Sequence, residues 1–288
     1  MTVRPRRSPR LAVTVGDPRG IGPEVVDKAL AAPLEAEIVV VGSGERGAVG
    51  SEVEAGRIAG RAIEDAVRLA LAGEVDAIVT GPVHKRALRV AGYDCPGVTE
   101  LLSHLTGGTP VAMMLAAGAL RVVLVTTHLP LRDVPAAVTT ERVVRAGRIT
   151  RDALRRWWGI DAPRLAVCAL NPHAGDGGLF GDEDDRVLRP AAEALEAAGP
   201  LAADTVFVRA LRREFDAVLA PYHDVGMTAV KVAGFGKGVN VTLGLPFPRT
   251  APDHGTALDI AGKGVADWGS MRAALELAVE LAKRSVGG

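Results

Sequence analysis

Short apolar runs alternate with longer amphipathic segments along most of this 288-residue chain. Apolar runs of roughly four to eight residues are typical of buried strands, and apolar positions three and four apart are typical of helices. The alternation therefore predicts an α/β protein. The predicted strands are residues 11–15, 37–41, 76–80, 111–116, 121–127, 165–170, 216–220 and 239–243.

Helix signals lie between these runs. Pro23 suits the first turn of a helix, and Glu24 favours the positive end of its dipole. Residues 52–72 place small and apolar side chains on one face and are followed by Gly73, a typical helix stop. Two further helices are predicted, one over residues 140–158 and one after Ser270.

Composition limits the classes of partner. Lys and Arg total 34 and so do Asp and Glu, so no excess charge favours nucleic acid or a membrane surface. Cys95 and Cys168 lack zinc-finger spacing and are expected to be buried thiols of a reducing cytoplasm. The apolar run 11–15 is too short for a signal peptide, and 111–125 is too short for a membrane span. A cytoplasmic location follows as an expectation.

Three histidines follow predicted strands directly: His128, His173 and His223. Ligands of open α/β sheets gather beyond the carboxyl ends of the strands. Imidazole is the commonest metal ligand, and three imidazoles with one open position are typical of a catalytic metal site. The alternative is that each histidine is an ordinary hydrogen-bonded turn residue, and on spacing alone this alternative is the more frequent one.

The sequence segments around these histidines and elsewhere in the chain resemble those of a known family. The matching segments are GDPRGIGPE (16–24), TGPVHK (80–85), TTHLPLRD (126–133), NPHAGDGG (171–178), GPLAADT (199–205), YHD (222–224), GFGKGVNVTLGLPFPRT (234–250) and DHGTALDIAGKG (253–264). In this order they resemble the 4-hydroxythreonine-4-phosphate dehydrogenases, the PdxA family, and their paralogues. The resemblance spans nearly the whole chain.

The resemblance implies a single dehydrogenase unit over residues 1–288 with two α/β lobes around an active-site cleft. One lobe would be built from discontinuous chain, as in the isocitrate and isopropylmalate dehydrogenases, and the sequence does not reveal where the lobes divide. The resemblance also implies a divalent cation on His128, His173 and His223, either zinc, magnesium or cobalt. In such a homodimer with a shared active site, His223 would come from the opposite subunit.

The segment 254–264 resembles the adenosine-binding loop of the isopropylmalate dehydrogenases. His254, Gly255, Thr256, Ala257 and Asp259 are its candidate cofactor-binding residues. A carboxylate at the ribose hydroxyls favours NAD over NADP. The alternative is a glycine-rich turn before a helix. The GxGxxG pattern at 42–47 is rejected as a dinucleotide fingerprint, because no helix opens at Gly47.

The substrate residues implied by the resemblance are Thr99, Lys231, Asn240 and Arg249, with Asp204 close by. A lysine and an arginine with an amide between them can hold a phosphate or carboxylate through charge-assisted hydrogen bonds. Lys231 and Asp204 are the candidate catalytic residues, because a nearby cation would lower the pKa of Lys231 and make it a proton shuttle. In isolation these residues would more often be solvated.

Three departures from the family pattern concern the substrate. Val98 stands where the family has a histidine, which removes one polar contact. Leu179 follows the glycines of the third segment, where a polar residue is common. Between Val41 and Ala55 the chain is shorter than typical members by several tens of residues.

The predicted function is metal-dependent, NAD-linked oxidation and decarboxylation of a phosphorylated 3-hydroxy acid, 4-phosphooxy-threonine or a close analogue. Other substrates stay open: D-threonate or D-erythronate 4-phosphate, or a dihydrodiol carboxylate. A metal-dependent hydrolase or lyase and a non-catalytic homologue are the alternatives from other classes. Nucleic acid and membrane are not expected as partners.

Overall fold

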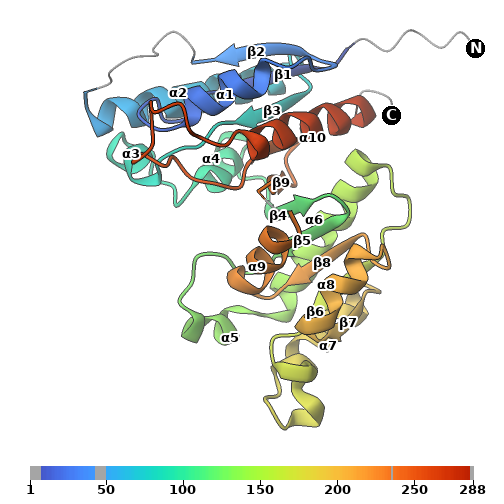
Figure 1. Ribbon diagram of the computed structural model, residues 1–288. Coiled ribbons are helices and arrows are strands. Elements are labelled where there is room, and N and C mark those ends of the chain that lie inside the picture. Colours follow the sequence, from blue (N-terminus) through green and yellow to red (C-terminus); the bar gives the residue numbers. More distant parts are fainter. Residues whose placement is uncertain (1–7, 43–49, 235, 286–288) are drawn as a thin grey trace, which may run out of the picture. The chain divides into compact units, whose positions relative to one another are not determined.

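The computed structural model describes residues 8–42, 50–234 and 236–285. The chain forms two compact units (Figure 1). Unit 1 comprises Met1–Pro110 and Val239–Gly288, so both ends of the chain contribute to it, and unit 2 comprises Val111–Gly238.

The sheet strands of unit 1 follow the order β2-β1-β3-β10-β9. They are β1 (Arg10–Thr14), β2 (Glu37–Val41), β3 (Ala77–Thr80), β9 (Val239–Leu243) and β10 (Arg249–Pro252). All neighbours pair in parallel except β10 and β9, which are antiparallel. The central strands β1 and β3 are almost completely buried, as expected when helices cover both faces of a parallel sheet.

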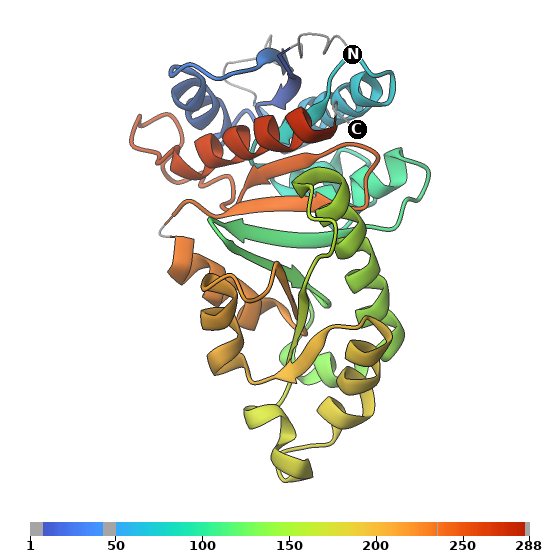
Figure 2. The same cartoon turned by 90° about the vertical axis from the view of Figure 1, so that its right-hand side faces the viewer.

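The helices of unit 1 are α1 (Gly22–Leu30), α2 (Glu52–Leu71), α3 (Lys85–Val90), α4 (Val98–Leu105) and α10 (Gly269–Ser285). Helix α2 begins after Ser51, whose side chain accepts a hydrogen bond from the Glu54 amide, as an N-cap should. Gly73 follows it with a φ of 70°, which suits glycine at a helix end. Helix α10 packs along β3 and β10 (Figure 2).

The strands of unit 2 follow the order β4-β5-β8-β6-β7. They are β4 (Ala112–Ala117), β5 (Leu120–Leu124), β6 (Leu165–Cys168), β7 (Ala198–Leu201) and β8 (Ala217–Ala220). Strands β4 and β5 form an antiparallel hairpin, whereas β5, β8, β6 and β7 run parallel. A core of small and branched side chains, including Val122, Ala166 and Val218, fills the space under the helices.

The helices of unit 2 are α5 (Val134–Ala137), α6 (Thr140–Trp158), α7 (Arg189–Ala194), α8 (Ala203–Leu211) and α9 (His223–Gly234). Short helical turns cover Leu131–Asp133, Pro172–Gly178 and Asp184–Leu188. Helix α6 ends at Gly159, which adopts a left-handed φ of 65°. None of the described helices is both long and apolar enough to cross a membrane.

The α/β class and each of the predicted strands are confirmed. Two strands were not predicted, β7 and β10, because each is short and each contains proline or a charged residue. The predicted strands 121–127 and 165–170 end early, at Leu124 and Cys168, so the histidine segments begin sooner. Both cysteines are free, but only Cys168 is buried; burial raises its pKa to about 12, whereas Cys95 is partly exposed.

Candidate active site

Four candidate residues of unit 2 follow neighbouring parallel strands. His128 comes after β5, His223 after β8, His173 after β6 and Asp204 after β7. Because these strands are parallel and adjacent, their carboxyl ends lie at one edge of the unit 2 sheet. The sequence placed the three histidines at strand ends, and the strand order makes those ends neighbours.

His128 and His223 come together because their segments stay paired beyond the strands. The Pro221 carbonyl accepts hydrogen bonds from the Thr126 amide at 3.2 Å and from the Thr126 hydroxyl at 2.7 Å. The ring centroids of His128 and His223 lie 5.5 Å apart. Nδ1 of His223 lies 2.8 Å from the Asp224 carboxylate, an arrangement that orients an imidazole and leaves Nε2 for a ligand.

His173 lies at the start of an unusual left-handed turn. Every residue from His173 to Gly178 has a positive φ, and for His173, Ala174 and Asp176 the values are 53°, 56° and 44°. Non-glycine residues adopt this region at a cost of about 1–2 kcal/mol each. Such strain is found preferentially at functional sites, so the turn is a further reason to regard His173 as a site residue.

A buried carboxylate fixes the backbone before His173. Asp184 is fully buried, and its two oxygens accept hydrogen bonds from the amides of Leu170 at 2.8 Å and Asn171 at 3.0 Å. The Asn171 side chain in turn donates to Glu183 at 2.8 Å. The sequence analysis missed Asp184, because nothing in the acidic stretch 182–185 distinguishes the one buried member.

The three predicted metal ligands do not gather in one chain. Among the described residues, no group of three His, Cys, Asp or Glu side chains could hold a metal ion. His128 and His223 form a pair, whereas the aromatic neighbour of His173 is Phe180, with centroids 6.4 Å apart. The pair that forms within one chain is His128 with His223, whereas the resemblance implied that His223 would come from the opposite subunit.

The candidate catalytic residues are both exposed. Asp204 lies in the first turn of α8. Lys231 lies on α9, eight residues after His223, which corresponds to roughly 12 Å along a helix axis. Backbone placement therefore does not bring Lys231 next to the His223 imidazole of the same chain.

In unit 1, Arg249 is a buried cation held by hydroxyl groups. Its Nε and Nη2 donate to the Thr80 hydroxyl, with Nε at 3.1 Å, and its Nη1 donates to the Thr242 hydroxyl at 3.0 Å. Only 4% of the residue is exposed, yet no described carboxylate forms an ion pair with it. Burial lowers the pKa of Arg249 to about 10, so the guanidinium is still charged at neutral pH.

Asn240 shares a sheet face with Arg249. Thr242 is paired with Arg249 across the β9–β10 ladder, and Asn240 is two residues from Thr242, so their side chains share one face. The Asn240 side-chain oxygen is buried, and no described group hydrogen-bonds to it. Two predicted substrate residues therefore lie on one polar face, and Thr80 and Thr242 are members of it that sequence reasoning missed.

The predicted cofactor loop packs closely against the start of α1. The Ile21 amide donates to the Thr256 carbonyl at 2.9 Å. A Cβ on Gly20 would lie 2.7 Å from that same carbonyl, so only glycine allows this approach. Ala257 has a left-handed φ of 39°, and the loop continues as turns rather than entering a helix.

The far end of the loop is held by an ion pair on α1. Lys28 donates to the Gly264 carbonyl at 2.8 Å, and Glu24 accepts from the Ala266 amide at 2.9 Å. Glu24 and Lys28 also bond each other at 2.7 Å, which lowers the pKa of the Glu24 carboxyl. The loop is thus anchored at both ends to one helix.

Two loop side chains have polar atoms that the described chain does not engage. The Asp259 carboxylate is exposed and has neither a hydrogen bond nor an ion pair within the described residues. The Nε2 atom of His254 is buried, and no described group is its partner. A carboxylate open to solvent beside a backbone-lined turn fits a pair of ribose hydroxyls.

Thr99 and Val98 begin helix α4, which follows Gly97. Thr99 is buried and Val98 is partly buried. The rejected GxGxxG pattern lies, beyond Gly42, outside the described residues.

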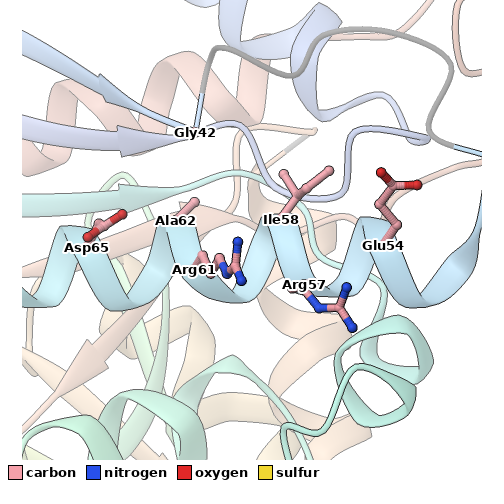
Figure 3. A pocket seen from close by; sticks show the side chains of 7 residues that line it. All are labelled: Gly42, Glu54, Arg57, Ile58, Arg61, Ala62 and Asp65. Carbon is pink, nitrogen blue, oxygen red and sulfur yellow. The ribbon is translucent and has the colours of Figure 1, made fainter.

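A pocket of about 330 Å³ lies on α2 in unit 1 (Figure 3). Gly42 and six residues of α2 line it: Glu54, Arg57, Ile58, Arg61, Ala62 and Asp65. Its charges are mixed, and it includes none of the predicted site residues.

The fold is shared with a solved β-decarboxylating dehydrogenase. That protein, from Thermococcus kodakarensis, is 17% identical and superposes with a TM-score of 0.52 over 92% of this chain and 81% of its own. The model of the family described as pyridoxal phosphate biosynthetic protein PdxA matches residues 24–278. The chain belongs to this family of dehydrogenases.

Individual relatives differ in the substrate that they are named for. A 4-hydroxythreonine-4-phosphate dehydrogenase from Geobacter metallireducens is 42% identical, with 99% of each chain aligned. A protein of Bradyrhizobium diazoefficiens, provisionally named D-threonate 4-phosphate dehydrogenase, is also 42% identical, over 96% of this chain and 97% of its own. The crystal structure of a 4-hydroxythreonine-4-phosphate dehydrogenase from Klebsiella pneumoniae has a TM-score of 0.87 at 38% identity, over 96% and 98% of the two chains.

The alignments also show that this chain is shorter than its relatives. The match to the Geobacter protein spans 337 positions, whereas this chain has 288 residues, so about 50 positions of that relative have no counterpart here.

Proposed function

We propose that this protein oxidises the hydroxyl group of a phosphorylated 3-hydroxy acid with NAD and releases carbon dioxide from the resulting β-keto acid. The observation that carries the substrate class is Arg249, a buried guanidinium on one face with Asn240 and without a carboxylate partner in the described chain. A buried cation of this kind is stabilised by an anion with several oxygen acceptors, such as a phosphate.

The proposed cation ligands are His128, His173 and His223. A divalent cation, zinc, magnesium or cobalt, would supply a Lewis acid that favours ionisation of the substrate hydroxyl. The His128–His223 pair and the adjacent strand ends support this assignment. Since one chain does not assemble all three, we also propose a homodimer in which the partner subunit completes the site.

The protein's own side chains have distinct roles in this proposal. Arg249 and Asn240 hold the anionic end of the substrate, and Thr99 contributes a hydroxyl contact. Lys231, with Asp204 nearby in the assembled site, carries the proton to and from the reacting oxygen and carbon. The loop with His254, Gly255, Thr256, Ala257 and Asp259 binds the adenosine half of NAD.

The particular hydroxy acid is proposed as 4-phosphooxy-threonine or D-threonate 4-phosphate. Relatives named for the two substrates are equally identical to this chain, so overall similarity favours neither. Val98, which lacks a polar atom at a position where the family has histidine, supports a substrate with a smaller or apolar group there.

The deciding experiment is an NADH absorbance assay of the full chain with a panel of phosphorylated hydroxy acids, with and without each cation. We expect one member to be oxidised, with the unphosphorylated analogue at least a hundredfold poorer in kcat/KM. No NADH from any member would refute the proposed function. A higher kcat/KM with NADP than with NAD would refute the role of Asp259.

A further inference from the structure

Arg249 differs from other arginines of this chain in what holds it. Arg19 forms a bidentate pair with the buried Asp17, at 2.8 and 3.1 Å, and Arg164 pairs with Asp216 at 3.1 Å. Arg249 is more deeply buried than either, yet its described partners are the neutral hydroxyls of Thr80 and Thr242. Burial makes a counter-charge most valuable at Arg249, yet none of the described residues provides one.

The two threonines fix the guanidinium without neutralising it. The Thr80 oxygen accepts from Nε and Nη2, along one edge of the planar group, and the Thr242 oxygen accepts from Nη1. Three of about five N–H donors are used in this way, and one donor on each terminal nitrogen is left. An oriented pair of donors with an undiminished charge suits a multiply charged oxyanion.

Other atoms on the same face are also polar and buried without a described partner. They are the side-chain oxygen of Asn240 and the hydroxyl of Thr14, which is the register partner of Thr80. The strands β1, β3 and β9 thus add neutral polar atoms around one cation. None of these polar atoms around Arg249 belongs to an acidic side chain.

We propose that Thr80 and Thr242 are positioning residues that keep Arg249 charged, oriented and free of an internal counter-ion, and that this arrangement selects phosphorylated over unphosphorylated substrates. The inference rests on the proposed function in one respect, namely that Arg249 meets the anionic end of the substrate. It adds that selectivity depends on the neutrality of the two hydroxyl partners.

The test compares two substitutions of equal size, Thr242→Asp and Thr242→Asn, in the full chain. Both can accept a hydrogen bond from Nη1, but only aspartate adds a charge. Inorganic phosphate is the probe, and its Kd is measured by calorimetry and by thermal shift. We expect Asn to keep most of the phosphate affinity and Asp to weaken it roughly a hundredfold, because like charges would then face each other.

In the absence of phosphate, the order of the two melting temperatures should be opposite to the order of the phosphate affinities. Thr242→Asp should melt at a higher temperature than Thr242→Asn, because the buried guanidinium gains a partner. Equal phosphate affinity in the two variants would overturn the proposal.

A second pair of variants, at Thr80, tests the proposal if Thr242→Asp does not fold. Thr80→Val removes the hydroxyl at constant shape and should raise KM for the phosphorylated substrate at least about tenfold with little change in kcat. Thr80→Ser keeps the hydroxyl and should restore KM. Equal KM values for Ser and Val would overturn the positioning role.

Arg249→Met separates this inference from the proposed function. If the wild-type protein makes no NADH but binds phosphate in a manner that Arg249→Met and Thr242→Asp abolish, the function fails and the inference stands. If the wild type oxidises its substrate and Arg249→Met keeps full phosphate affinity, the inference fails and the function stands.

Discussion

The two units carry their candidate residues in contrasting ways. In unit 1, Arg249 and Asn240 belong to strands and share one sheet face; Arg249 is buried and held by two hydroxyl groups, and the side-chain oxygen of Asn240 is buried. In unit 2, His128 and His173 are exposed on connecting segments, and His173 has a left-handed backbone. Side chains on strands are set by the sheet itself, whereas loop residues depend on added supports.

In terms of the proposed function, the residues assigned to the substrate are preformed in unit 1, whereas those assigned to the cation do not gather in one chain. On the sheet face around Arg249, the side-chain oxygen of Asn240 and the hydroxyl of Thr14 are buried without a described partner. Unit 2 pairs His128 with His223 and holds the His173 segment through Asp184, but it does not bring three ligands together.

Metal removal should have the largest effect on activity, because it acts on the proposed metal site, which one chain does not complete. Treatment of the full protein with a chelator should lower the rate of NADH formation about a thousandfold or more. His173→Ala and His128→Ala should do the same, and zinc, magnesium or cobalt should restore only the wild type. Undiminished turnover after complete metal removal would mean that the histidines are ordinary turn residues.

Asp184→Asn should destabilise unit 2 next most strongly. The amide nitrogen would face the Leu170 or Asn171 N–H that the carboxylate now accepts from, so one buried donor would lose its partner. The free energy of unfolding should fall by about 2–3 kcal/mol in denaturant titration. Asp185→Asn is the matched control, because Asp185 is exposed and pairs with Arg189 on the surface; its cost should stay below about 1 kcal/mol.

Equal losses in the two variants would show that burial of Asp184 does not support the His173 segment. Metal affinity should also fall in Asp184→Asn, by roughly ten- to a hundredfold, as for other residues that orient metal ligands.

Val98→His tests the preformed half. Val98 is partly buried at the start of α4, directly before the buried Thr99. If the substrate has a small or apolar group there, the imidazole blocks it or is a buried polar group without a partner, and kcat/KM should fall roughly tenfold. A rise of that size on 4-phosphooxy-threonine would show instead that the ancestral substrate is retained. An unchanged kcat/KM on every substrate would place position 98 outside the site.

How far sequence reasoning reaches also differs between the units. The histidines were found because they directly follow apolar runs, and the strands were found from the same runs. Arg249 was found only through the family resemblance. Thr80, Thr242 and Asp184 were missed, because their roles depend on register across β3, β9 and β10 or on burial of one acid among four. The composition of a segment predicts that it is a strand, whereas the identity of its neighbour is a tertiary property.

The smallest expected effect concerns the strained turn at His173. Ala174 has a left-handed φ of 56°, a region that glycine adopts without the steric cost of a Cβ. Ala174→Gly should therefore raise the free energy of unfolding by about 0.5–1 kcal/mol, since the strain relieved exceeds the added chain entropy. Ala194→Gly, at an exposed position at the end of α7, should lower it by about 0.5–1 kcal/mol, because its backbone is helical. Denaturant midpoints of the two variants should thus move in opposite directions. If both fall, the turn at His173 is not strained, and its left-handed backbone is no evidence for function.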